Sequence, residues 1–171
     1  MKKLLTLIVL AAATSAFAAS PYVGASAGYL IDDEIGFYTA RIGTDLVQKG
    51  GLTHSIEAEI GYASDTAYGV KLEIIPVMAN YRLSGNLGTS PFRFYAGAGA
   101  GFSRQKLTRL VHDDAWAFAA QAFGGVETTL TPRTSLTLGA RYLWLNNYTI
   151  ANVRIGSSDD VSIELGIRFR L

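Results

Sequence analysis

The chain has 171 residues, with 15 Lys or Arg against 14 Asp or Glu, so its formal net charge is only +1. This balance offers no electrostatic basis for binding nucleic acid. The absence of cysteine excludes disulfides and thiolate metal sites, and no segment beyond the N-terminal one is apolar over 18 residues, so helical membrane spans are not expected.

The N-terminal segment has the three parts of a secretory signal peptide. Two lysines follow the initial Met, the apolar run Leu4–Ala13 comes next, and Ala16-Phe17-Ala18 supplies small residues for a signal peptidase. The alternative, an amphipathic first helix, would need a polar face, which this run lacks. We therefore expect residues 1–19 to be a signal peptide and residues 20–171 to form one domain.

The remaining chain divides into eight segments in which apolar and polar or small residues alternate. In Tyr22–Leu30, for example, Val23 and Ala25 fall on one face and Gly24 and Ser26 on the other. Such alternation over short, turn-bounded segments predicts β-strands. The predicted strands are Tyr22–Leu30, Phe37–Leu46, Ser55–Tyr62, Tyr68–Leu83, Phe92–Phe102, Trp116–Leu130, Ser135–Leu145 and Val161–Leu171.

The fourth segment changes phase. Leu72 and Ile74 alternate with Lys71 and Glu73, but beyond Pro76 the apolar positions move by one residue. Because proline cannot donate a ladder hydrogen bond, we expect a β-bulge there.

The eighth segment places six apolar residues, from Val161 to Leu171, on one face of a strand that ends the sequence. A transmembrane barrel needs such a strand, since its last strand pairs with its first. Ile167, Phe169 and Leu171 are the last three of these apolar residues.

Most charged side chains of the strands share the face opposite the apolar one. Either this face lines the interior of a membrane barrel, or it meets water around a soluble lipocalin-type barrel. The same face carries many glycines, which suits a crowded narrow interior and favours the membrane barrel. The expected interior residues are Arg41, Glu57, Glu59, Lys71, Glu73, Arg82, Arg93, Glu127, Arg141, Glu164, Arg168 and Arg170.

The connections differ in length between the two ends of the predicted barrel. If both termini are periplasmic, the outward loops are residues 31–36, 63–67, 104–115 and 146–160, and the last two are the longest and most polar.

Three segments resemble the small outer-membrane β-barrel family, which includes the OmpA membrane domain, OmpX and the opacity-type proteins. They are Phe92–Gly101, Gln121–Glu127 and Leu138–Leu143. The resemblance covers the whole mature chain and implies an all-β, eight-stranded antiparallel up-and-down barrel in the outer membrane of a Gram-negative-type bacterium. It implies adhesion, surface protection or envelope integrity as roles. It also implies that Ile167, Phe169 and Leu171 form the signal for the outer-membrane assembly machinery, with Leu171 where the family usually has an aromatic residue.

An eight-stranded barrel is just wide enough for side chains to fill, so we interpret the interior charges as an ion-pair network. Unpaired charges would be costly to bury there. Arg41, Arg141 and Arg168 are candidate partners of Glu59, Glu127 and Glu164. The alternative is a small-solute channel or proton path.

A lipid A-modifying enzyme is a further alternative, because such barrels use His, Ser and an acid. His54 and Ser55 fall on opposite strand faces near the predicted periplasmic end, which opposes catalysis. His112 lies beside Asp113 and Asp114 on the outer side, with Ser103 nearby in sequence.

Acidic groups in the outward loops could offer oxygen ligands to a cation, but their spacing matches no dedicated calcium loop. These groups are Asp32-Asp33-Glu34, Asp113-Asp114 and Asp159-Asp160. We expect no catalytic residue, no cofactor and no metal site.

The predicted function is therefore structural or interactive. The expected partners are outer-membrane lipids, lipopolysaccharide, the assembly machinery and an extracellular ligand that contacts residues 104–115 and 146–160.

Overall fold

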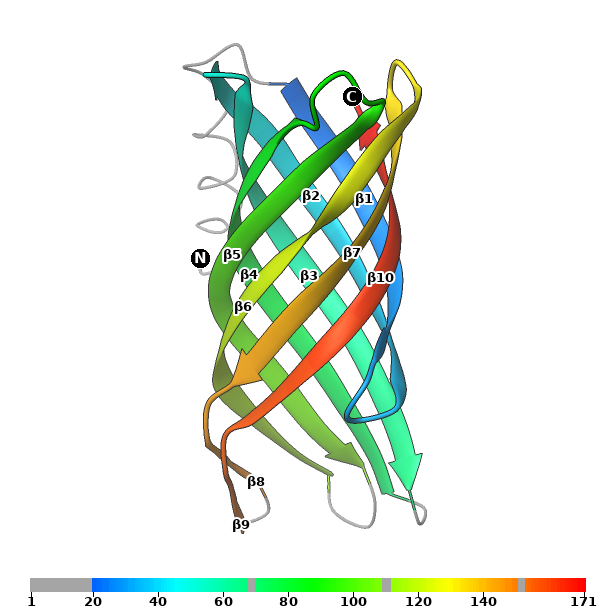
Figure 1. The fold of residues 1–171 in the computed structure, drawn as a ribbon. Coiled ribbons are helices and arrows are strands. Elements are labelled where there is room, and N and C mark those ends of the chain that lie inside the picture. Colours follow the sequence, from blue (N-terminus) through cyan, green and yellow to red (C-terminus); the bar gives the residue numbers. More distant parts are fainter. Residues whose placement is uncertain (1–19, 68–69, 109–111, 151–152) are drawn as a thin grey trace.

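The computed structural model describes residues 20–67, 70–108, 112–150 and 153–171. The predicted signal peptide, residues 1–19, lies outside the described residues. Eight long strands form a closed barrel in the order β1-β10-β7-β6-β5-β4-β3-β2 (Figure 1). The strands are β1 (Ser20–Leu30), β2 (Ile35–Lys49), β3 (Leu52–Ala67), β4 (Val70–Asn86), β5 (Phe92–Thr108), β6 (His112–Thr131), β7 (Thr134–Leu145) and β10 (Ser158–Arg170). Within the described residues, no helix is long and apolar enough to cross a bilayer.

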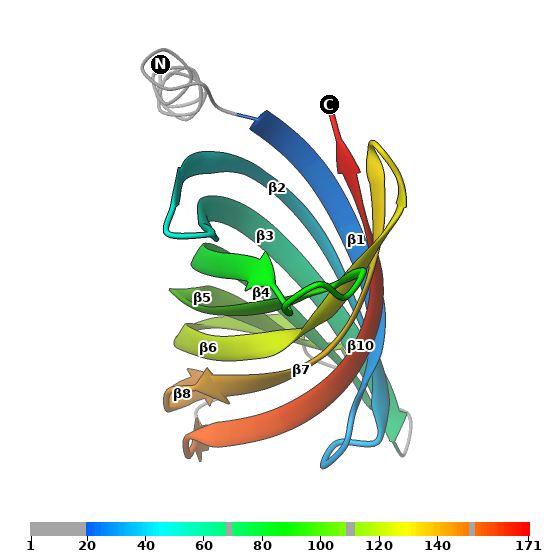
Figure 2. The same ribbon diagram turned by 45° about the horizontal axis from the view of Figure 1, so that its top comes forward.

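The barrel closes because β1 pairs with two strands at once. It runs antiparallel to β2 from Ser20↔Asp45 to Leu30↔Ile35, and antiparallel to β10 from Tyr22↔Arg170 to Leu30↔Ser162. Closure leaves no free sheet edge along these strands. Figure 2 shows β1 and β10 side by side, which confirms the predicted up-and-down barrel.

The two faces of the sheet decide between the membrane barrel and the soluble barrel. On β10, Ile163, Leu165 and Ile167 are 50–57% exposed on the outer surface. Glu164 and Arg168, on the opposite face, are buried. A soluble barrel would show the reverse arrangement, so the apolar outer surface identifies a barrel built for lipid.

β1 begins and β10 ends at the same end of the barrel (Figure 1), where the Leu171 N–H donates to the Pro21 carbonyl at 2.9 Å. We call this the terminal end and the opposite one the distal end. At the terminal end, Gly50 and Gly51 connect β2 to β3 with φ of 61° and 80°. Consecutive positive φ values are what a tight two-residue hairpin turn requires, and glycine adopts them without strain.

Strands β3 to β6 are longer at the distal end than the alternation suggests. They have 16, 17, 17 and 20 residues, whereas about 9–11 residues cross a bilayer. The predicted loop 104–115 is therefore largely wrong: β5 and β6 pair as far as Thr108↔His112. The predicted loop 63–67 likewise belongs to β3, which pairs with β4 as far as Ala67↔Val70.

The predicted loop 146–160 also contains regular structure. Strands β8 (Tyr148–Ile150) and β9 (Val153–Ile155) form a short antiparallel hairpin. β10 already begins at Ser158, which pairs with Leu145 of β7.

The bulge predicted at Pro76 is wrong. The β3–β4 register is the same on both sides of it, from Ile60↔Val77 to Ala63↔Ile74, and β4–β5 pairing runs through Pro76↔Ser103 without a shift. The apolar phase changes because the surroundings change: Ile74 is buried inside the barrel, whereas Val77 is exposed on the outer surface. Register shifts occur instead near the terminal end, between Asp45 and Val47 and between Thr129 and Thr131.

Candidate functional site in the barrel interior

The centre of the interior is an ion-pair cluster around Arg141 of β7. Its guanidinium donates to both oxygens of Glu59 on β3, to Glu164 on β10 at 2.6 Å, and to the Gln121 side-chain oxygen at 2.6 Å. Arg41 adds a second cation, 3.6 Å from Glu59 and 3.8 Å from Glu164. Two arginines thus balance two carboxylates in a space that water reaches poorly, which is the condition for burying such charges.

Neutral polar groups complete this cluster. Gln121 donates to Glu59 at 3.1 Å and to the Asn80 oxygen at 2.7 Å. Ser26 donates to Glu164 at 2.8 Å and accepts from Arg41 at 3.0 Å. These bonds give each carboxylate a further donor, which lowers the cost of its burial.

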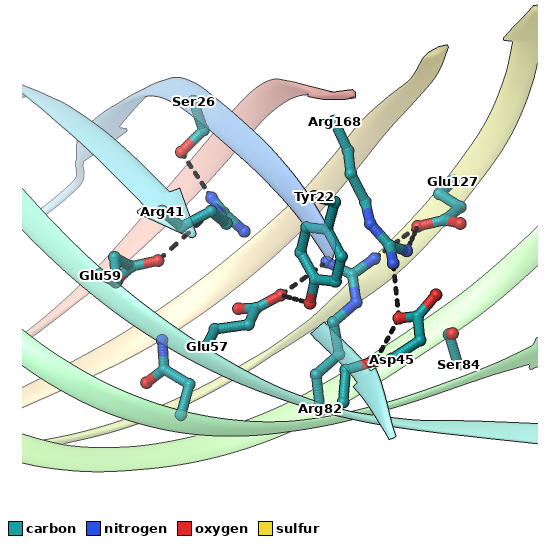
Figure 3. A network of polar contacts seen from close by, with 12 residues as sticks. Tyr22, Ser26, Arg41, Asp45, Glu57, Glu59, Arg82, Ser84, Glu127 and Arg168 are labelled. Carbon is teal, nitrogen blue, oxygen red and sulfur yellow. Dashed lines mark hydrogen bonds and ion pairs between the residues drawn. The ribbon is translucent and has the colours of Figure 1, made fainter. Parts of the chain in front are cut away.

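A second cluster lies nearer the terminal end, around Arg82 (Figure 3). Arg82 is only 1% exposed; it contacts Glu127 at 2.5 Å and Glu57 at 3.7 Å. The Tyr22 hydroxyl donates to Glu57 at 2.7 Å, and Arg168 stacks on the Tyr22 ring at 3.7 Å. The Tyr22 ring and the Arg168 guanidinium therefore fill this part of the interior, and a cation–π contact holds them together.

The terminal-end opening is rich in arginine. Arg168 bonds Asp45 at 2.7 Å and lies 3.6 Å from Glu127. Arg93 lies 3.4 Å from Glu127, and Arg170 is half-exposed, 3.5 Å from Asp45. Arg93 and Arg170 line a cavity of about 670 Å³ that opens at this end.

Two of the predicted interior residues lie elsewhere. Lys71 and Glu73 are on the outer face of β4 and pair with each other at 2.8 Å, and Lys106 lies 3.5 Å from Glu73. Placing them inside was wrong, because the strand keeps its register past Pro76 and these positions therefore face outwards. The other ten predicted residues are in the interior or at its terminal-end opening.

Several interior residues were not predicted. Tyr22, Asp45, Asn80 and Gln121 all share the strand face of the predicted charges, so strand parity was the signal that could have found them. Tyr22 is fully buried.

Above the polar clusters, towards the distal end, apolar side chains gather in the interior, beside the buried Ser103 and Gln105. Nine buried residues form one cluster. They are Leu30, Ile35, Phe37, Ala63, Ile74, Met78, Ala119, Leu143 and Leu145. Polar clusters and apolar layer thus follow each other along the barrel axis.

The candidate catalytic and metal-binding residues from the sequence do not form a site in the described part of the chain. Ser55 is buried in the interior and donates to Asp45 at 2.7 Å, whereas His54 contacts the Tyr81 hydroxyl on the opposite face of the sheet. Ser103 is buried and accepts from Gln105, whereas the side chain of His112 lies outside the described residues. Among the described residues, no three His, Asp or Glu side chains gather as metal ligands would.

The apolar outer surface, the closed sheet and the paired interior charges define a transmembrane β-barrel. The family model described as outer membrane protein beta-barrel domain matches residues 4–169. The chain belongs to this family, and it is a protein of the Gram-negative outer membrane.

Solved structures agree with this fold. Neisserial surface protein A (NspA) is 17% identical, with a TM-score of 0.68 over 90% of this chain and 99% of that one. A major outer membrane protein from Thermus thermophilus is 14% identical, with a TM-score of 0.56 over 90% of this chain and 100% of that one. The N-terminal β-barrel domain of Pseudomonas aeruginosa OprF is 14% identical, with a TM-score of 0.52 over 89% of this chain and 97% of that one. No curated protein matches the chain.

Proposed function

We propose that this protein is a closed, non-enzymatic outer-membrane barrel with a structural or surface-contact role, in adhesion or envelope integrity. The observation that carries the proposal is that side chains fill the interior at two successive levels, first the ion-pair clusters and then the apolar cluster. A solute would have to displace Arg141 from Glu59 and Glu164, and then also pass the apolar layer around Phe37.

Electrostatics supports the closed interior. Separating Arg141 from its two carboxylates would leave its guanidinium without a carboxylate and would leave Glu59 and Glu164 with Arg41 as their shared cation. In a poorly hydrated space this costs several kcal/mol. An ion would then meet the apolar cluster, which offers no replacement for its hydration shell.

Single-channel recording in planar bilayers tests the closed interior against the channel alternative. We expect no discrete conductance steps from the wild-type protein. Steps whose size changes in Arg41→Gln or Glu127→Gln would favour the channel instead, because both residues lie in the interior.

We further propose that the terminal end faces the periplasm and the distal end the exterior, where it offers the contact surface. The chain has no cysteine, so single introduced cysteines are unique labels. A membrane-impermeant maleimide on whole cells should label Asn147→Cys at the distal end and spare Lys49→Cys at the terminal end. Crosslinking from Asn147→Cys, with Lys49→Cys as the matched control, would then identify the surface partner.

The enzymatic alternative has a direct test. Lipid A from cells with and without the protein should give the same mass spectrum. A difference that disappears in His112→Ala would overturn the non-enzymatic proposal.

A further inference from the structure

A second cavity opens at the distal end and has a different chemical character from the arginine-rich opening. Its volume is about 190 Å³. Leu30, Leu72, Ile74, Leu143 and Leu145 supply its apolar wall. This is smaller than the roughly 300–1,000 Å³ of pockets that enclose drug-sized ligands, so any occupant is small or inserts only a short chain.

Besides Ser158 and the aspartates, the polar side chain of Gln105 lines this cavity. Gln105 is fully buried, and its amide donates to Ser103 at 2.9 Å. Its other polar atom, Oε1, is buried without a hydrogen-bond partner among the described residues. An unpaired buried acceptor is costly, so a ligand or solvent donor in the cavity would be stabilised there.

The rim of the cavity is acidic. The Asp160 carboxylate is held in place by the backbone N–H groups of Asp32 and Asp33, at 3.1 and 3.0 Å. Asp33 also lines the cavity, and its pKa is raised by partial burial and by the neighbouring carboxylates, Asp160 first. Among the described side chains, neither Asp33 nor Asp160 forms a salt bridge with a cation.

We propose that this cavity binds a small organic cation of the alkylammonium class. The ammonium group lies between Asp33 and Asp160, and the alkyl chain packs on Leu30, Ile74 and Leu143. A second N–H donor on a longer ligand would reach Gln105. This goes beyond the proposed closed barrel, since the cavity sits above the ion-pair clusters and its occupancy does not require solute passage.

The chemistry of the cavity argues against other ligand classes. A divalent metal ion needs several oxygen ligands gathered around one point, and among the described residues no three His, Asp or Glu side chains gather in this way, although Asp33, Asp159 and Asp160 all line the cavity. An anion would be repelled by the two aspartates, and a neutral hydrocarbon would leave them unneutralised. A monovalent cation with an apolar chain satisfies both parts of the site.

Binding can be measured on the full chain refolded in zwitterionic detergent micelles, by NMR titration of the backbone amides. The probes are n-butylammonium, the neutral n-butanol and the anionic butyrate. We expect saturable shifts with butylammonium, centred on the turn that contains Asp33 and on Ile74. We expect no saturation with butyrate, and an affinity for butanol that is about tenfold weaker, because a charge-assisted hydrogen bond contributes about that factor.

Two variants and a control complete the test. Asp33→Asn should weaken butylammonium binding about tenfold, and Ile74→Phe should abolish it by filling the cavity. Glu34→Gln should bind like the wild type, because Glu34 carries the same charge in the same turn but does not line the cavity. Heat-modifiable migration on gels confirms that each variant is folded.

Equal affinities for butylammonium and butanol would overturn the proposal, as would butylammonium binding that survives Ile74→Phe. Absence of saturation in the folded wild type would also overturn it. The closed-barrel proposal would be unaffected, since it is tested by conductance.

Discussion

The central ion-pair cluster makes a strong prediction about stability. Replacing Arg141 by Met keeps much of the side-chain volume but leaves Glu59 and Glu164 with a single cation, Arg41, at 3.6 and 3.8 Å. Removing one partner of a buried ion pair costs about 3–5 kcal/mol, because an uncompensated charge stays buried. In a water-filled interior, the same change would cost only about 0–1 kcal/mol, as for exposed pairs.

The measurement is equilibrium unfolding in urea of protein refolded into lipid vesicles, followed by tryptophan fluorescence and by heat-modifiable migration. We expect Arg141→Met to lose about 3–5 kcal/mol of unfolding free energy. The double variant Arg141→Met/Glu164→Gln should recover part of this loss, because it restores the charge balance. Arg104→Met is the control, since Arg104 pairs with Asp114 at 2.8 Å in an exposed position.

The reasoning would be refuted if Arg141→Met and Arg104→Met cost the same. A small cost for both would mean that water screens the interior charges, and the closed-barrel proposal would lose its main support. Failure of the double variant to recover any stability would show that the lost contacts matter through packing and not through charge.

Three further predictions concern other parts of the barrel. Glu73→Gln should cost less stability than Glu59→Gln in the same urea assay, because Glu73 lies on the outer face and Glu59 is buried among arginines. Gly139→Ala should destabilise by about 1–3 kcal/mol, since an added Cβ would lie 2.1 Å from the Tyr95 hydroxyl oxygen; Tyr95→Phe should relieve part of this loss. If the assembly machinery recognises the apolar face of β10, Phe169→Ser should reduce the amount of heat-modifiable protein in the outer membrane of cells. The yield of refolding in vitro, where that machinery is absent, should fall less.

The sequence was sufficient to predict the strands and their faces wherever lipid lies on one side and packed charges on the other. From Val161 onwards every second residue of β10 is apolar, and the intervening Glu164 and Arg168 point inwards. This contrast has a period of two, which no other regular structure reproduces. The strands and their two faces could therefore be predicted from alternation, whereas the choice between a membrane barrel and a soluble one also needed the glycines of the charged face.

The partners of the interior charges could not be predicted in the same way. Glu59 of β3 contacts Arg41 on the neighbouring strand, but also Arg141 on β7, across the interior. Parity shows that both arginines face inwards, yet it does not say which level of the barrel each one reaches. That depends on the stagger between strands, which is set by the whole closed ladder.

The error at Lys71 and Glu73 has a physical cause that also locates the membrane boundary. On the outer face of β5, the aromatic Phe102 is followed two residues later by Arg104, which pairs with Asp114. Aromatic residues favour the membrane interface and exposed charges favour water, so the hydrocarbon region ends near this level.

Inside the barrel, at about the same level, the side chains change from polar to apolar towards the distal end. Gln121 and Glu59 belong to the polar cluster, whereas Ile74, Leu143 and Leu145, nearer the distal end, belong to the apolar layer. On β4 both faces thus reverse their polarity where the strand leaves the lipid: Lys71 and Glu73 lie outside, and Leu72 and Ile74 lie inside. Beyond that level the outer face meets water, and the interior is held together by apolar packing as in a soluble barrel. A reversal of alternation within an unbroken strand can therefore mark the membrane boundary, and a proline beside it does not by itself indicate a bulge.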